Sequence, residues 1–355
     1  MTSSTTTAPA PDHAPTPPPA GAGQRARAGA ASALRVGGLI LSVFAVGVVY
    51  EILSGGSFFG LDNLLGILRA TSTVAILGLG FLLVLIVGEI DLSFGNLYGL
   101  SASLMAVSWI LWDWPVWVAI PFTFLVAAGW GAFNAFFTTV AKIPSFIATL
   151  GSSTLIFGFT LLITNSNSYN PAYPPGPHVI DAGQLSAFTA ISNEPLPFNF
   201  PMQGVWLIAA ALIFWFLLSR SIFGFRLIAI GGNPAAARLA RIPVRKYKFV
   251  AFITCSVMAC FAALLDFSFI GSTQPNAGQT LLFPTFAAVI IGGASLSGGR
   301  GTVIGTVTGA LLLAVLVNGI AILAAGPFVQ QMVVGSVTIG AVVLDQLTQR
   351  RRATS

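Results

Sequence analysis

Four polar side chains stand out because they border long apolar runs. Glu89, Asp91 and Ser93 fall within GEIDLSFG at 88–95, and Asp266 lies near the end of another apolar run. An acid at the centre of a membrane helix costs about 2.5–3.5 kcal/mol, and less near the helix end. We therefore predict that these residues serve a polar substrate path through a membrane. Two other interpretations stay open: Asp91 caps the following helix, or Asp266 sits at the membrane interface.

The composition predicts the membrane setting. Only 7% of the 355 residues are charged and 55% are hydrophobic, whereas a soluble domain carries about 25% charged residues. A soluble enzyme, a secreted disulfide scaffold and a disordered regulator are thereby excluded. Apolar runs of about twenty residues favour helices over the alternating strands of an outer-membrane barrel. The predicted fold is an all-α polytopic protein of the cell membrane, surrounded by lipid.

Ten apolar runs are predicted to span the membrane within a domain at 36–346. They are 36–53, 71–90, 96–111, 116–140, 145–164, 203–219, 248–266, 281–292, 302–324 and 327–346. The eighth run is short and precedes a glycine-rich stretch, so a broken or re-entrant helix is one interpretation. The Thr-, Ala- and Pro-rich residues 1–35 predict a disordered cytoplasmic tail, and 347–355 a second cytoplasmic tail.

The basic residues predict the orientation. The connection 220–248 carries seven Lys or Arg residues and no acid, whereas 165–202 carries two acids and no Lys or Arg. The positive-inside rule places 220–248 in the cytoplasm and 165–202 outside. Ten spans with both termini in the cytoplasm satisfy this arrangement. The outer connection is either a solvated loop or a docking surface for an extracellular partner.

Two glycine-bounded motifs resemble each other. GEIDLSFG at 88–95 and GGASLSGG at 292–299 share the pattern G-x-x-[D/S]-L-S-x-G between apolar runs, which predicts an internal duplication as in many transporters. Neither contains the Gly-Lys-Ser/Thr of a phosphate-binding loop. The sequence also lacks His-Glu-x-x-His and any clustering of Ser, His and Asp. We expect no enzymatic activity, no bound cofactor and no metal site, and we attribute the net charge of +6 to topology and not to nucleic acid.

A short helix is predicted at 233–242, inside the cytoplasmic connection. Asn233 is a favoured N-cap, Pro234 suits the first helical position, and Pro243 stops the helix at the preceding residue. The expected contact face of small side chains is Ala235, Ala236, Ala237 and Ala240, and Arg238 and Leu239 complete the helix. A two-turn helix is marginal in water, so we expect it to rest on the spans or on a partner. A plain connector is the alternative.

Four motifs together resemble permease subunits of ribose-type bacterial sugar ABC importers. They are GEIDLSFG, IPSFIATLGS at 143–152, AIGGNPAAARLARI at 229–242 and IIGGASLSGGRGTVIGT at 290–306. The resemblance implies a permease that moves a pentose, hexose or related polyol delivered by an extracellular binding protein. It also implies a second permease chain and cytoplasmic ATP-binding subunits, which use the ATP and meet the helix at 233–242.

One residue departs from the family pattern, since Glu89 stands where the family has glycine. An acid there alters substrate choice or forms a salt link with a nearby base. Other transport functions also stay open: an ABC permease for a nucleoside, a branched-chain amino acid or a signalling furanose, or an ion-coupled secondary transporter. The last would explain the acids and the repeat without an ATPase.

Overall fold

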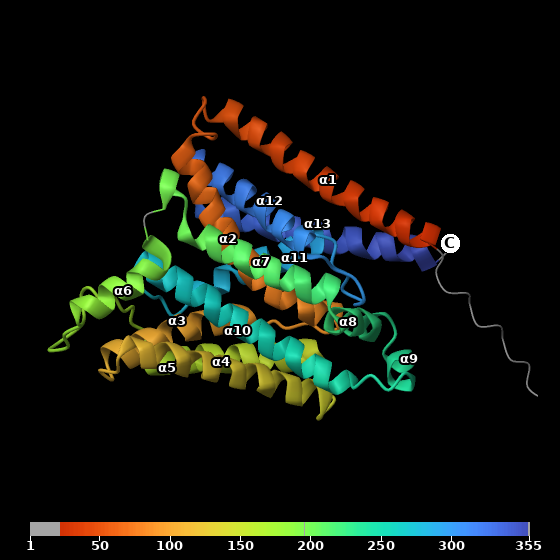
Figure 1. Ribbon diagram of the computed structural model, residues 1–355. Coiled ribbons are helices and arrows are strands. Elements are labelled where there is room, and N and C mark those ends of the chain that lie inside the picture. The colour runs from red at the N-terminus through yellow and green to blue at the C-terminus, as the bar shows by residue number, and fades with distance from the viewer. Residues whose placement is uncertain (1–21, 195, 354–355) are drawn as a thin grey trace, which may run out of the picture.

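Figure 1 shows the computed structural model of the chain, which describes residues 22–194 and 196–353. Within these ranges the chain forms helices, and its only β-type pairing is an isolated bridge between Tyr169 and Thr273. The α-helices are α1 (Ala22–Leu53), α2 (Leu61–Ile86), α3 (Phe94–Ile110), α4 (Val116–Thr139), α5 (Ser145–Thr164), α6 (Ala182–Asn193), α7 (Met202–Arg220), α8 (Ile222–Gly232), α9 (Pro234–Leu239), α10 (Val244–Ile270), α11 (Leu282–Ile291), α12 (Val303–Ile322) and α13 (Gly326–Ala353). Two short 3-10 helices are η1 (Pro197–Asn199) and η2 (Ala277–Thr280).

Eight helices of the described residues are long and apolar enough to cross a membrane. They coincide with eight of the ten predicted spans, and the other two predicted spans fall on α3 and α11. Helix α3 has 17 residues and α11 only 10. Ten residues extend about 15 Å, half of the ~30 Å hydrocarbon core, so the eighth predicted span is a half-helix. The predicted all-α polytopic membrane fold is confirmed.

The terminal helices extend further than the sequence predicted. Helix α1 begins at Ala22, inside the predicted disordered tail 1–35, and α13 continues to Ala353 through the predicted tail 347–355. The stretch 22–35 is rich in Ala and Arg, which favour helix, so the helix of the span continues into it. The predicted disorder of residues 1–21 concerns a part of the chain outside the described residues.

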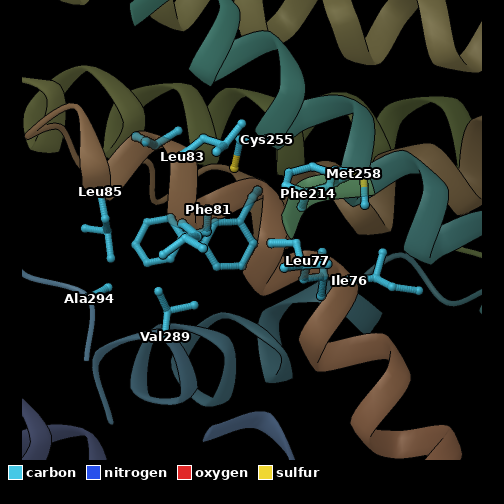
Figure 2. Packing of buried hydrophobic residues seen from close by; sticks show 14 of the residues in the cluster. Ile76, Leu77, Phe81, Leu83, Leu85, Phe214, Cys255, Met258, Val289 and Ala294 are labelled. Atoms are coloured by element: carbon cyan, nitrogen blue, oxygen red, sulfur yellow. The ribbon is translucent and has the colours of Figure 1, made fainter. Parts of the chain in front are cut away.

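The buried core surrounds the second half of α2. Figure 2 shows Phe81 of α2 among side chains of α10 and α11, with Cys255 on one side and Val289 on the other. All three side chains are buried. Helix α10 approaches closely because residue 80 is glycine: a Cβ there would lie 2.8 Å from the Cβ of Met258. Helix α2 is therefore the central element of the bundle, and its far end carries the first predicted site residues.

The two long connections lie at opposite ends of the bundle. Figure 1 shows α8 and α9 at the same end of the bundle as the start of α1 and the end of α13, and α6 at the other end. Helix α6 belongs to the acidic connection 165–202, and α8 and α9 belong to the basic connection 220–248. This separation agrees with the predicted topology, in which both termini and the basic connection share one side of the membrane.

Cysteine labelling tests the orientation. Ser168 and Ala236 are exposed and lie in the two opposite connections, whereas the natural thiols of Cys255 and Cys260 are buried. Single cysteines at positions 168 and 236, in a background without the natural ones, are expected to react with an impermeant thiol reagent from opposite sides of the membrane. Reaction of both from one side would contradict the predicted orientation.

Candidate functional site

The structure divides the four predicted path residues between two places. Glu89, Asp91 and Ser93 lie in the break between α2 and α3. Asp266 lies one turn before the end of α10, in contact with the middle of α2 and the first turns of α3. The four predicted residues therefore belong to two separate polar regions.

Asp91 and Ser93 brace the break between α2 and α3. Both side chains are fully buried. The Oδ1 atom of Asp91 accepts hydrogen bonds from the backbone N–H of Ser93 (2.8 Å) and from its hydroxyl (2.6 Å). Asn134 of α4 donates to the Ser93 hydroxyl at 2.7 Å. The hydroxyls of Ser145 and Thr149 in α5 accept hydrogen bonds from backbone N–H groups of the break. These contacts fix the irregular backbone to α4 and α5.

Glu89 forms a salt bridge with Lys248, in the first turns of α10. The two side chains are only 14% and 17% exposed, so both charged groups have lost most of their water. The salt link is one of the two roles predicted for an acid at this position. It joins the α2–α3 break to the end of the cytoplasmic connection.

Breaking this salt bridge from one side is expected to destabilise the protein more than removing both partners. Glu89→Gln or Lys248→Met leaves a largely buried charge without its partner, at a cost of about 1–3 kcal/mol. The double variant removes both charges and is expected to recover part of that loss. Thermal unfolding of the purified variants in detergent gives the coupling energy; strictly additive losses would show that the pair contributes nothing.

Asp266 borders two cavities and is held from two helices. Thr73 of α2 donates to its Oδ1 at 2.8 Å, and the hydroxyl of Tyr98 in α3 donates to its Oδ2 at 2.7 Å. The cavities have volumes of about 580 and 320 Å³, and Asp266, Thr280 and Leu281 line both. Both volumes fall within the range of about 300–1,000 Å³ typical of small-molecule sites.

A larger cavity of about 910 Å³ lies between α1, α7, α8 and the start of α12. Among the described residues no acid, amide or basic side chain lines it, and the polar side-chain groups are the hydroxyls of Ser219, Ser221 and Thr302 and the indole N–H of Trp215. Recognition of a polar solute needs converging polar groups, so size alone does not make this cavity the site. The region around Asp266 is the better candidate.

Arg69 is a charged residue that the sequence analysis left outside the spans. The predicted span begins at 71, but α2 begins at Leu61, so Arg69 lies within the helix and one turn before Thr73. Its guanidinium lies 5.0 Å from the ring centre of Phe269 in α10. Asp62, an acid in the first turn of α2, was the available signal for the earlier start, because acids favour helix N-termini.

Helix α9 confirms the predicted N-cap but is shorter than the predicted helix at 233–242. The Oδ1 atom of Asn233 accepts from two backbone N–H groups, at 3.0 and 3.1 Å. The helix covers only Pro234–Leu239. It ends before the predicted stop because Arg241 adopts a left-handed conformation with φ of 58°, which no α-helix continues.

The predicted contact face of α9 needs one correction. Ala237 is buried against the rest of the chain (4% exposed), so it is not available to a partner. Leu239 is 88% exposed and lies among the exposed alanines. The outward surface, called here the outer face of α9, consists of Ala235, Ala236, Leu239 and Ala240.

Glycines of three segments meet directly beside α9. The N–H of Gly299 donates to the carbonyl oxygen of Ile86 at 2.9 Å. A Cβ at Gly231, the penultimate residue of α8, would lie 1.7 Å from that oxygen and 2.3 Å from the Gly299 nitrogen. Gly298, with φ of 83°, lies against Gly88. This glycine junction joins the end of α8 to both motifs that the sequence analysis found to be similar.

Comparison with known proteins assigns the family. Residues 63–342 match the family described as branched-chain amino acid transport system / permease component. The chain belongs to this permease family. The permease is therefore a multi-pass membrane protein, as its apolar helices also indicate, and the resemblance carried by the four motifs is confirmed.

Several curated proteins resemble the permease along most of their length. The ribose import permease protein RbsC of Escherichia coli is 32% identical over 311 residues, covering 87% of this chain and 94% of the relative. The xylose transport system permease protein XylH of Escherichia coli is 30% identical, covering 90% and 93%. A probable ABC transporter permease of Sinorhizobium fredii is 33% identical and covers 89% of each chain. No solved structure matches the permease.

Proposed function

We propose that this permease is the membrane-spanning subunit of an ATP-driven importer that moves a sugar into the cytoplasm. The glycine junction carries the proposal, because it joins the end of α8, which leads directly into α9, to the α2–α3 break and to the α11–α12 loop. The sequence has no phosphate-binding loop of its own. A separate cytoplasmic subunit binds and uses ATP and docks on α9. Its movement is passed through the glycine junction to the α2–α3 break and to the α11–α12 loop.

The names of the relatives support a sugar as the solute. Two of them are named for ribose import and xylose transport, and a pentose, hexose or related polyol suits a path with hydroxyl and carboxylate groups. The solute arrives from an extracellular binding protein at the connection 165–202 with α6, passes Asp266, and leaves beside the break that contains Glu89, Asp91 and Ser93. A second permease chain completes the importer.

A branched-chain amino acid is the second candidate solute, because the family description names it. The carboxylate of an amino acid normally requires a cationic partner in a desolvated site. No Lys or Arg of the described residues lines either cavity at Asp266. The described linings therefore offer the carboxylate of an amino acid no cationic side-chain partner, and the relatives named for ribose and xylose favour a sugar.

Uptake by the assembled transporter tests the proposed function. Proteoliposomes that contain the permease, its ATPase and the binding protein are expected to accumulate tritiated ribose or xylose only with ATP, and to ignore tritiated leucine. Protonophores and sodium ionophores should not change the rate. Uptake of leucine alone would support the second candidate, and ATP-independent uptake that ionophores abolish would identify a secondary transporter.

A further inference from the structure

The two cavities beside Asp266 are separated by a thin partition. Asp266, Thr280 and Leu281 line both of them. The larger cavity extends between α12 and α13, and the smaller one follows α3 and the segment 272–277. Thr280 ends η2 and Leu281 precedes the half-helix α11. Two of the three residues shared by the cavities therefore belong to the short segment between α10 and α11, and Asp266 belongs to the last turns of α10.

The Asp266 carboxylate has free capacity to accept hydrogen bonds. Thr73 and Tyr98 each donate one bond, one to each oxygen, whereas an ionised carboxylate has about four acceptor positions. None of the ion pairs in the described part of the chain involves Asp266. The remaining acceptor positions belong to a side chain that borders both cavities, so a solute in either cavity can donate to it.

Two residues of the cavity linings carry oxygen atoms that lack a hydrogen-bond partner and are covered by neighbouring atoms in this conformation. The Oδ1 atom of Asn318 in the larger cavity and the Oγ1 atom of Thr273 in the smaller one are buried and have no hydrogen-bond partner. Gln330 and Gln331 add amide groups to the larger cavity. Unpartnered acceptors are satisfied by a ligand that brings several donors, and the absence of a lining Lys or Arg from the described residues disfavours an anion.

We propose that the two cavities are successive chambers for one neutral polyhydroxyl solute and that Asp266 binds its hydroxyls as it crosses the partition. Asn318 binds the solute in the larger chamber. Tyr98 and Thr73 are positioning residues, since each holds one carboxylate oxygen in place. The solute passes when Thr280 and Leu281 move aside. This inference rests on the proposed function and adds to it the residues that bind the solute and the point of passage between the cavities.

The first test compares two aspartates in the complete transporter. Asp266→Asn keeps the size of the side chain but replaces one acceptor oxygen by a donor. Asp62→Asn is the matched control, because Asp62 is exposed and lines neither cavity. With whichever of ribose and xylose the unmodified transporter imports, Asp266→Asn is expected to lower uptake at least tenfold, and Asp62→Asn less than twofold. Co-purification of the ATPase should be unchanged in both variants.

The second test detects the solute at the partition. Thr280→Cys, in a background without Cys255 and Cys260, is labelled with a small charged methanethiosulfonate reagent. The imported sugar is expected to slow labelling at least threefold, and leucine is not. A transporter that imports none of a panel of pentoses, hexoses and polyols overturns the proposed function itself. Sugar import that continues at the unmodified rate in Asp266→Asn, or labelling at 280 that the imported sugar does not slow, overturns the two-chamber inference alone.

Discussion

Gly231→Ala is expected to lower solute uptake at least tenfold, whereas Gly232→Ala should leave uptake unchanged. The Cβ at position 231 would lie 1.7 Å from the carbonyl oxygen of Ile86, so α8 has to move away from α2. A backbone contact cannot adapt as a side chain does, and overpacking of this kind costs about 1–3 kcal/mol. The movement also separates the end of α8, and with it α9, from the α2–α3 break and the α11–α12 loop.

Gly232 is the matched control for this change. It is the next residue of the same helix. Apart from its chain neighbours and the backbone of α8, no atom lies within 4 Å of a Cβ built there. Both variants add one methyl group to the same helix end, so helix propensity cannot distinguish them. ATP-driven uptake and the melting temperature of the purified permease are the measurements. Equal uptake by the two variants would disprove the role of the glycine junction.

Leu239→Glu is expected to reduce co-purification of the ATPase at least tenfold. Leu239 is 88% exposed on the outer face of α9, and a buried anchor at an interface commonly contributes about 2 kcal/mol or more. A carboxylate placed there would be desolvated without a partner. Ala236→Trp tests the same face by added bulk and is expected to act in the same direction.

Val179→Glu controls for the general effect of an acid on an exposed apolar residue. Val179 is 86% exposed and lies in the connection 165–202, at the opposite end of the bundle. Its replacement should leave the ATPase bound. Ala237 is unsuitable for this experiment because it is buried within the chain, so a large residue there would disturb α9 itself. Retention of the ATPase by Leu239→Glu and Ala236→Trp would leave α9 as a plain connector.

The sequence predicted the features that depend on local pattern. Apolar runs of sufficient length located the spans, and the Asn233-Pro234 pair located the start of α9, because an N-cap is a contact between neighbouring residues. Small residues act locally too: Gly305 and Gly309 lie four residues apart in α12, and a Cβ at Gly309 would lie 2.1 Å from the carbonyl oxygen of Ala288 in α11. The helix interface there is a consequence of residue size.

The features that depend on distant segments could not be predicted in this way. Nothing local marks Gly231 as the glycine that meets Ile86, since 145 residues separate the two. The burial of Ala237 depends likewise on how α9 packs against the bundle. The role of Glu89 depends on which basic residue lies beside it. The sequence contains several candidates, and only the fold shows that the partner is Lys248. The two chambers at Asp266 are formed by residues from two distant parts of the chain, 70–102 and 266–334.

The short length of α11 has an electrostatic consequence. A helix that crosses the whole membrane leaves both ends in water, where their partial charges are screened. Helix α11 begins at Leu282, inside the bundle, and the preceding Leu281 borders both chambers beside Asp266. The aligned peptide dipoles place about half of a positive elementary charge at that end. Backbone polarity thus offsets the negative carboxylate, and no flexible cationic side chain has to leave the path before a neutral solute can pass.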